Sequence, residues 1–286
     1  MDLKPITLTT DFGHKDPFVG IMKGVIFGIN PHANVIDLSH GIPAQDLLAG
    51  ALVLRYAAPA FPSGTIHIAV VDPGVGSERR PLLIESEGAF FIGPDNGVLS
   101  LALEGKTVSR ITHLANESYH LKPASATFHG RDIFAPVAAY LSLGIAPGDF
   151  GDSVNDFTRL AWPKVTEAAG ALDFTRLAWP KVTEAAGALA GKVIYIDGFG
   201  NLITNIRERD LSPFDPQGLA ISVAGVTVRG IASHYRSGGE RVCTAIINSW
   251  GLLEIFSFKG NAQLLCGAQI GDAVSVRQTG TGEQAP

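Results

Sequence analysis

The stretch IHIAVVDPGVGSERR, residues 66–80, decides the fold prediction. Its first half is apolar and rich in β-branched side chains, which is typical of a strand buried on both faces of a parallel sheet. Asp72 ends the apolar run, and Pro73 and two glycines then allow a tight turn. Because ligands of open α/β sheets bind just outside the carboxyl ends of the strands, Asp72 is a candidate site residue. A surface turn capped by Asp72 is the alternative that this stretch alone leaves open.

The composition excludes several classes of protein. The chain has 286 residues, of which 46% are hydrophobic and 17% charged, so we expect a globular protein with two domains. A net charge of −5 without any basic run argues against nucleic acid or an anionic membrane as a partner. No apolar run reaches membrane-spanning length and the N-terminus lacks a signal-peptide pattern, so a cytoplasmic location is expected. The two cysteines are expected to be buried thiols in a reducing compartment.

The pattern of predicted elements changes along the chain. Over the first 150 residues strands alternate with helices, which indicates an α/β layer fold. The strands are expected at 5–10, 34–38, 66–71, 82–86 and 89–92, and the helices at 18–29, 46–58 and 137–143. Later strands, at 192–197, 218–228, 242–248, 252–256 and 273–276, are separated by Gly and Asn turns with almost no helix. That second pattern indicates an all-β sandwich or barrel.

Between the two patterns the chain repeats itself. Residues 156–172, DFTRLAWPKVTEAAGAL, recur without a change at 173–189. Two copies of so short a period do not make a solenoid, and their identity indicates a recent duplication. The Trp-Pro pair in each copy forces an extended residue before the proline, so neither copy is expected to be one continuous helix. Long surface insertions cost little in loop-closure entropy, so we expect the fold to tolerate the spare copy.

The predicted organisation therefore has three parts. An α/β domain with a mostly parallel central sheet covers residues 1–155, a linker containing the duplication covers 156–190, and a smaller all-β domain covers 191–286.

Several common catalytic signatures are missing from the sequence. There is no Gly-Lys-Ser/Thr phosphate loop, no GxGxxG after the first strand and no GxSxG elbow, which argues against a P-loop enzyme, a nicotinamide enzyme and a serine hydrolase. Asp11, Asp72 and His129 lack the spacing of a strong metal site, so no metal is expected.

Polar residues nevertheless follow several predicted strands. Asp11 ends the first strand, His129 precedes a helix beside Arg131 and Asp132, and Asp197 opens the segment DGFGN. Each has an ordinary structural alternative, namely a helix cap for Asp11, a capping or solvent-facing role for His129 and a simple turn for DGFGN.

Six motifs in order carry a resemblance that no single motif would. They are TTDFG (9–13), VVDPGVGSER (70–79), GPDNG (93–97), FHGRDIFAP (128–136), DGFGNLITN (197–205) and NSWGLLEI (248–255). Together they resemble the S-adenosyl-L-methionine (SAM) hydroxide adenosyltransferase family, which is related to the fluorinating and chlorinating adenosyltransferases. The resemblance covers nearly the whole chain. It implies an α/β domain followed by a β-barrel domain, a homotrimer with sites between neighbouring subunits, and conversion of SAM and water to adenosine and methionine without a cofactor.

The resemblance also assigns roles by motif position. Asp72, Arg79 and His129 match the set that activates water. The remaining matches are substrate contacts: Asp11 for the ribose diol, Asp197 for the methionine ammonium, Asn201 for adenine, Ser249 for the methionine carboxylate, and Asn96 and Phe128 as further binding residues.

At two positions the comparison with the family's motifs is not straightforward. Trp250 stands where the fluorinating relatives have an arginine, so recognition of the carboxylate would rest on Ser249 and the backbone. Arg80 adjoins Arg79, so the choice of Arg79 rests only on its spacing from Asp72.

The sequence also bears on two functions other than SAM hydrolysis. A halide could replace water as the nucleophile, but the halogenating relatives carry an uncharged residue where this chain has Asp72, and a carboxylate would repel a desolvated anion. A non-catalytic SAM or adenosine sensor would need Asp11, Asp197 and Asn201 but not the water-activating set. Whether His129 or Asp72 accepts the proton of water stays open at this level.

Overall fold

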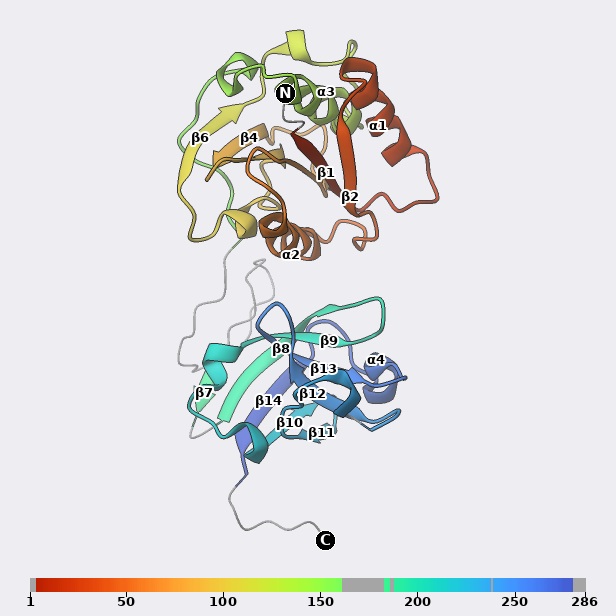
Figure 1. The fold of residues 1–286 in the computed structure, drawn as a ribbon, viewed down its shortest axis with the longest axis vertical. Coiled ribbons are helices and arrows are strands. Elements are labelled where there is room, and N and C mark those ends of the chain that lie inside the picture. Colours follow the sequence, from red (N-terminus) through yellow and green to blue (C-terminus); the bar gives the residue numbers. More distant parts are fainter. Residues whose placement is uncertain (1–3, 161–182, 186–187, 238, 280–286) are drawn as a thin grey trace. The chain divides into compact units, whose positions relative to one another are not determined.

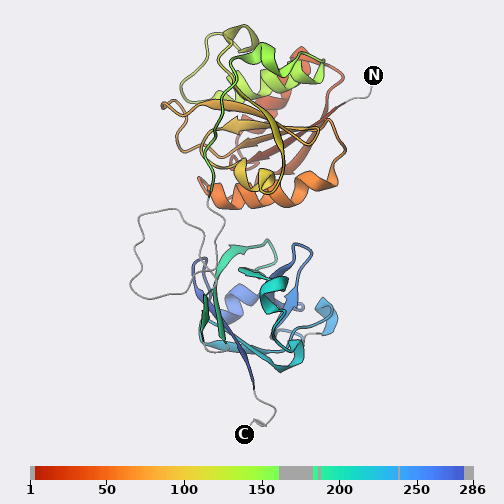
Figure 2. The same ribbon diagram turned by 90° about the vertical axis from the view of Figure 1, so that its left-hand side faces the viewer.

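The computed structural model of the chain describes residues 4–160, 183–185, 188–237 and 239–279. The chain divides into two compact units, the first ending at Leu160 and the second beginning at Ala161. Figures 1 and 2 show the elements of each unit, which are described separately below.

The first unit is built on a six-stranded sheet in the order β2-β1-β3-β5-β4-β6. The first four strands in this order are parallel, whereas β4 is antiparallel to both of its neighbours. Their bounds are β1 Pro5–Thr10, β2 Asn34–Ser39, β3 Ile66–Val70, β4 Pro81–Ser86, β5 Ala89–Pro94 and β6 Val108–His113. The mostly parallel sheet predicted from the sequence is confirmed, including the β4–β5 hairpin. The edge strand β6 was not predicted.

Helices cover both faces of this sheet (Figure 1). Helix α1 (Phe18–Ile29) and helix α3 (Ala135–Ser142) pack together over Ile6 and Leu8 of β1, while α2 (Leu47–Ala57) lies on the opposite face. All five residues of β3 are buried, which explains why its sequence is apolar without alternation. Burial of each large apolar side chain contributes about 1.5–3 kcal/mol, so this core holds the strand ends in place.

The helix predicted at 137–143 begins earlier than expected. A single π-helical turn, Gly130–Phe134, precedes α3 and continues into it. Pro136 is the second residue of α3 and lies inside this continuous helical segment, so the proline does not mark the helix start. As a result His129 sits directly at the N-terminal end of a helical segment.

The second unit is an antiparallel sheet in the order β11-β10-β14-β8-β9-β13-β12, with β7 paired to β8. A bridge between Ala232, just after β11, and Ile246 of β12 connects the two ends of this order, so the sheet is nearly a closed barrel. The predicted all-β, barrel-like unit is therefore confirmed. The bounds are β7 Thr183–Ala185, β8 Ala188–Ile196, β9 Leu202–Arg207, β10 Leu219–Val223, β11 Val226–Arg229, β12 Cys243–Ile247, β13 Leu252–Ser257 and β14 Ala273–Gln278, with one short helix, α4 Ala262–Cys266.

The two cysteines, 23 residues apart in sequence, meet in this second unit. Their Sγ atoms lie 3.0 Å apart and both thiols are free. Cys266 is buried, as expected, whereas Cys243 is only partly so. Burial and the contact with Cys243 raise the pKa of the Cys266 thiol to about 12, so it is protonated at neutral pH.

The described ends of the duplicated segment belong to different units. Asp156 and Thr158, at the start of the first copy, hydrogen-bond to the first unit, and the backbone N–H of Leu160 donates to Ser100. Leu189, the last residue of the second copy, is buried in the core of the second unit as part of β8. Residues 161–182, which include both Trp-Pro pairs, and residues 186–187 lie outside the described residues. The expected linker 156–190 thus shares residues with both units.

Candidate functional site

A cavity of about 400 Å³ lies at the carboxyl ends of β1 and β3. Thr10 and Val70, the last residues of these parallel strands, are direct neighbours, so Asp11 and Asp72 leave the sheet at the same edge. The cavity is lined by residues of three predicted motifs, including Asp11, Asp72, Phe128 and His129. Four predicted site residues, separated by up to 118 positions in the sequence, therefore meet in one hollow.

Arg79 connects the catalytic candidates. Its Nε donates to Oδ1 of Asp72 at 2.9 Å, and its Nη2 donates both to Oδ2 of Asp72 and to Nδ1 of His129, the latter at 2.7 Å. The Arg79 and Asp72 side chains are only 8% and 6% exposed, so this pair is well shielded from water. Bidentate arginine–carboxylate pairs hold the carboxylate in a fixed orientation.

The same contact sets the protonation of His129. A guanidinium can only donate, so Nδ1 of His129 must accept, and in the neutral ring the proton is then on Nε2. Burial, and next the positive charge of Arg79, lower the pKa of His129, although Asp72 and Asp132 oppose the shift. His129 is therefore a neutral imidazole at pH 7 that offers an N–H at Nε2.

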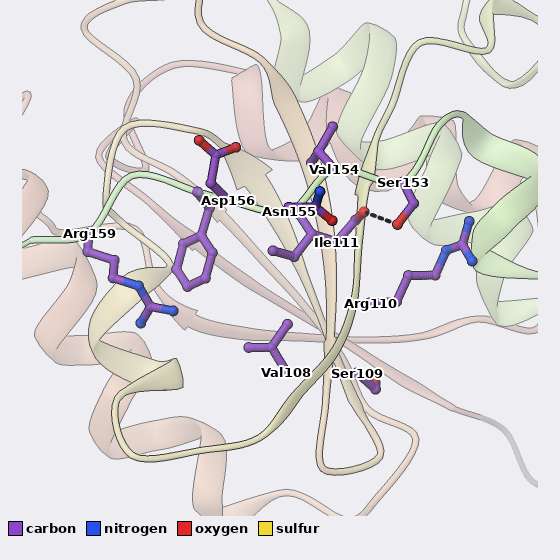
Figure 3. Close-up of a pocket in the computed structure, with 10 residues that line it drawn as sticks. Val108, Ser109, Arg110, Ile111, Ser153, Val154, Asn155, Asp156 and Arg159 are labelled. Carbon is purple, nitrogen blue, oxygen red and sulfur yellow. Dashed lines mark hydrogen bonds between the residues drawn. The ribbon is translucent and has the colours of Figure 1, made fainter.

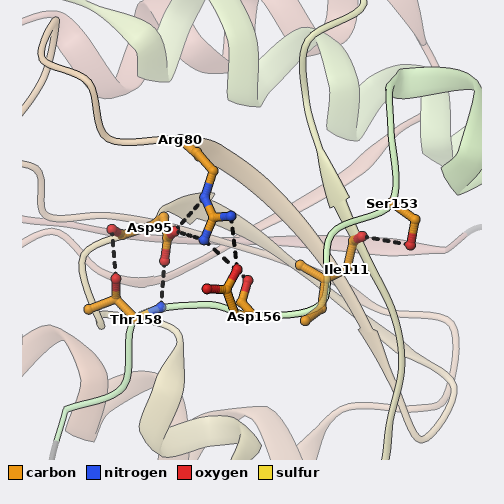
Figure 4. A network of polar contacts seen from close by, with 6 residues as sticks. All are labelled: Arg80, Asp95, Ile111, Ser153, Asp156 and Thr158. Atoms are coloured by element: carbon orange, nitrogen blue, oxygen red, sulfur yellow. Dashed lines mark hydrogen bonds and ion pairs between the residues drawn. The ribbon is translucent and has the colours of Figure 1, made fainter.

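The structure separates the two neighbouring arginines. Arg80 turns to another carboxylate, donating from Nε and Nη2 to Asp95 and from Nη1 to Asp156 (Figure 4). Thr158 also donates its backbone N–H to Asp95 at 2.6 Å. Arg80 thus anchors the start of the first repeat copy, and it is Arg79 that contacts Asp72 and His129.

The Asp11 end of the cavity has a polar and an apolar wall. Oδ2 of Asp11 accepts the backbone N–H of Gln45 at 2.8 Å. Gln45 adopts a positive φ of 66°, which is unusual for a residue with a side chain, and this bond fixes its orientation. The rings of Phe12, Phe18 and Phe128 meet edge to face with centroids 5.4–5.9 Å apart. These rings could contact a flat apolar group of a ligand.

Asn96 does not line this cavity. Its amide N–H donates to the backbone oxygen of Val71, and its carbonyl oxygen accepts from the N–H of Val98. In the structure it therefore supports the segment just before Asp72.

The candidates of the second unit lie in two turns. Asp197 caps its own turn, since its carboxylate accepts from the backbone of Phe199 and Asn201 and from the Asn201 side chain. Ser249 lies in the turn between β12 and β13, which Asn248 stabilises through bonds to Trp250 and Leu252. The Asp197 turn matches the simple turn given as the alternative for DGFGN, and the ligand roles of Asp197, Asn201 and Ser249 stay predictions.

Sequence reasoning missed a buried carboxyl beside these turns. Glu254 on β13 is only 3% exposed and accepts hydrogen bonds from Tyr235 and Asn248. Burial raises the pKa of Glu254 despite these bonds, and the charge of Asp197 raises it further. The signal was present in the sequence, because Glu254 is the only charged residue within the apolar strand LLEIFS.

A second hollow, of about 390 Å³, lies beside β6 (Figure 3). Its polar wall comes from Arg110 on β6 and from Ser153, Asp156 and Arg159 on the segment that follows the short 3-10 helix Pro147–Phe150. None of the predicted site residues lines it. Within the described part of the chain no group of three or more His, Cys, Asp or Glu is arranged to hold a metal ion, and no helix there is long and apolar enough to cross a membrane.

Comparison with known proteins supports the sequence resemblance. The profile described as the SAM hydroxide adenosyltransferase N-terminal domain matches residues 6–151, and that of the C-terminal domain matches residues 191–275. A protein of Methanocaldococcus jannaschii named (R)-S-adenosyl-L-methionine hydrolase is 34% identical over 283 residues, with 95% of each chain covered. One of the same name from Thermus thermophilus is 33% identical over 279 residues, covering 94% of this chain and 98% of its own.

More distant relatives and solved structures agree with this. A fluorinase of an Actinoplanes species is 25% identical over 232 residues, 72% of each chain. The crystal structure of an uncharacterized conserved protein from Thermotoga maritima has a TM-score of 0.83 at 30% identity and covers 96% of this chain and all of its own.

Proposed function

The chain belongs to the SAM hydroxide adenosyltransferase family, and from this premise we propose that it hydrolyses SAM to adenosine and methionine. In this reaction a water oxygen bonds to C5′ of the adenosyl group, the C5′–S bond breaks with its electron pair staying on sulfur, and one proton is released. The observation that carries the proposal is that Asp72 and His129 line one cavity with Asp11, while Arg79 hydrogen-bonds to both Asp72 and His129. The names of the curated relatives support it.

The sulfonium leaving group needs no acid, because sulfur departs as a neutral thioether. What the site must supply is a water held in line with the C5′–S bond, and such placement can contribute about 7–11 kcal/mol. We propose that this displacement proceeds in one SN2-type step.

Asp72 is the proposed proton acceptor. His129 already uses Nδ1 to accept from Arg79, so its remaining nitrogen bears a proton and can only donate to a water oxygen. Each Asp72 oxygen accepts from Arg79 yet keeps a further lone pair. Arg79 therefore orients both groups, with His129 positioning the water and Asp72 taking its proton.

The substrate contacts are proposed from the motif positions. Asp11 would bind the ribose diol and Phe128, with its neighbouring rings, the adenosyl moiety. Asp197, Asn201 and Ser249 would contact methionine and adenine, with Asn96 supporting the site. We further propose a cytoplasmic homotrimer whose sites lie between neighbouring subunits and which uses no cofactor. Light scattering of the purified protein tests the trimer.

Two other functions remain as outcomes of the test. A halide nucleophile is disfavoured by the Asp72 carboxylate, which would repel an anion entering a shielded site. A sensor that binds SAM without turnover is disfavoured by the joined Asp72–Arg79–His129 set, which binding alone does not require.

The deciding experiment incubates the purified protein with SAM in ¹⁸O-water, with and without chloride, and analyses the products by mass spectrometry. Adenosine labelled at its 5′ oxygen together with free methionine is the expected result. A 5′-chloro product would replace the proposal with the halide reaction, and bound but unchanged SAM would replace it with the sensor.

A further inference from the structure

His40 is a buried histidine that lies just outside the cavity. It follows β2, and its side chain is completely shielded from solvent. Nothing in the proposed chemistry uses it, and no motif singled it out. Its contacts nevertheless converge on the turn that carries Asp11.

The His40 side chain forms part of a directed chain of polar contacts. The backbone N–H of Phe12 donates to Oγ1 of Thr10 at 3.2 Å, and this oxygen lies 2.9 Å from Nδ1 of His40. On the other side of the ring, Nε2 lies 2.9 Å from Oδ1 of Asp37. The simplest proton arrangement has Thr10 donating to Nδ1 and Nε2–H facing the carboxylate.

Asp37 is held in its ionised form at the far end of this chain. Burial alone would raise the pKa of Asp37, but the hydrogen bond from Lys23 and the close contact with His40 outweigh burial and lower it. Lys23 of α1 lies 2.6 Å from the other carboxylate oxygen. Asp37 is therefore an ionised carboxylate that faces Nε2 of the His40 ring at 2.9 Å.

The main chain of His40 makes a second contact with the same turn. Its carbonyl oxygen accepts the N–H of Gly13 at 2.8 Å, and Gly13 has a positive φ of 68°. His40 thus holds Thr10 through its side chain and Gly13 through its backbone. Asp11 lies between these two fixed points.

We propose that His40, supported by Asp37, is a positioning residue that holds the Asp11 carboxylate for recognition of the ribose diol. Oδ2 of Asp11 is already engaged by the N–H of Gln45, so the diol must be met by Oδ1 and by the free lone pair of Oδ2. A small rotation of the turn would misplace both acceptors. This inference rests on the proposed binding of an adenosyl group at Asp11.

The chain supplies a matched control on the same strand. Thr7 of β1 is as fully buried as Thr10, and its Oγ1 lies 2.8 Å from Nδ1 of the buried His67. Thr7 does not line the cavity. Substituting valine at either threonine removes one buried Thr–His hydrogen bond at nearly equal side-chain volume. Only Thr10→Val also removes a bond to the Asp11 turn, the one from the Phe12 N–H.

The test measures nucleoside binding by calorimetry, using adenosine and 3′-deoxyadenosine as probes, for the wild type, Thr10→Val and Thr7→Val. We expect Thr10→Val to bind adenosine about 10-fold more weakly and 3′-deoxyadenosine almost as well as the wild type, since only the diol contact is lost. Thr7→Val should keep the wild-type preference for adenosine. With SAM, Thr10→Val should raise KM more than it lowers kcat.

The outcomes separate this inference from the proposed function. A wild type that binds neither nucleoside and does not turn over SAM would remove the proposed function. A wild type that prefers adenosine, together with a Thr10→Val protein that keeps the same preference, would overturn the role of His40 alone. If Thr10→Val fails to fold, the second variant is Asp37→Ala, at the partly exposed end of the series of polar contacts. It must show the same loss of preference for adenosine over 3′-deoxyadenosine. An unchanged preference in Asp37→Ala would also overturn the role of His40.

Discussion

At the scale of single residues, Arg79 sets the hydrogen-bonding roles of Asp72 and His129. Its donors fix the orientation of Asp72 and leave His129 with a proton on Nε2. Arg80, one position later, has the same chemistry but contacts Asp95 and Asp156 instead. Two adjacent and identical side chains thus have different partners: Arg79 contacts two residues that line the cavity, and Arg80 contacts the start of the first repeat copy.

This difference allows a matched test of Asp72. Asp72→Asn keeps the shape of the side chain but removes the proposed proton acceptor, so we expect kcat to fall about 10²–10⁴-fold while KM changes little. Asp95→Asn, which weakens the corresponding pair with Arg80, should leave kcat unchanged. Steady-state kinetics with SAM measures both. Equal losses of kcat and of SAM affinity in Asp72→Asn would indicate a binding role.

The lowered pKa of His129 predicts how kcat/KM for SAM falls at acidic pH. Protonation would place a proton on Nδ1, where Arg79 also donates, so the imidazolium cannot keep this hydrogen bond. Burial and Arg79 lower the pKa below the ordinary value of 6.5, and the neutral form therefore persists below that pH. We expect the acid-side decline of kcat/KM to have its midpoint below pH 6.5. A decline centred above pH 6.5 would contradict this assignment.

At the scale of elements, strand β13 carries an ionisable group in an otherwise apolar setting. All six of its residues are buried, and Glu254 is among them. Asn248 and Tyr235 satisfy its oxygens, and Asn248 also stabilises the turn that contains Ser249. The strand therefore links the predicted Ser249 turn to a carboxyl group whose protonated form is favoured by folding.

Glu254→Gln is predicted to stabilise the protein in a pH-dependent way. The folded-state pKa of Glu254 is raised above the ordinary value of 4.5, so the wild type loses stability as pH rises from that value through the raised one. The uncharged glutamine avoids this loss. Thermal unfolding should give similar midpoints for both proteins at pH 4 and a higher midpoint for the variant at pH 8.

The control for this prediction is Glu240→Gln, which removes an exposed carboxylate paired with Lys259. Exposed pairs contribute little to stability, so its midpoint should follow that of the wild type at both pH values. A Glu254→Gln midpoint shift that does not change with pH would show that packing, and not charge burial, is responsible.

At the scale of the whole molecule, the two ends of the duplicated segment contact different units. The start of the first copy is bonded to the first unit and the end of the second copy enters β8. Because the copies are identical, removing either one leaves the same sequence, with DFTRL at the front and GAL at the end. A single copy therefore contains every residue type that makes a described contact of the repeat.

We predict that deletion of 156–172 leaves the protein folded and its SAM hydrolysis unchanged. The deletion places AWPKV between the docked leucine and the threonine that begins β7. Activity assays and light scattering, compared with the full chain, measure the outcome. An insoluble or inactive deletion product would show that the extra residues are required by the fold or the assembly.

The sequence by itself determined the order and type of most elements and the family, because apolar periodicity and glycine-rich turns are local properties of the chain. It missed the edge strand β6 and the early start of the helical segment after His129, where local pattern is weak. Only the tertiary structure decided that Arg79 and not Arg80 joins Asp72, that His129 presents a protonated Nε2, and that His40 holds the Asp11 turn. The physical reason is that hydrogen bonds depend on the direction and separation of particular atoms, and these become defined only when distant segments pack together.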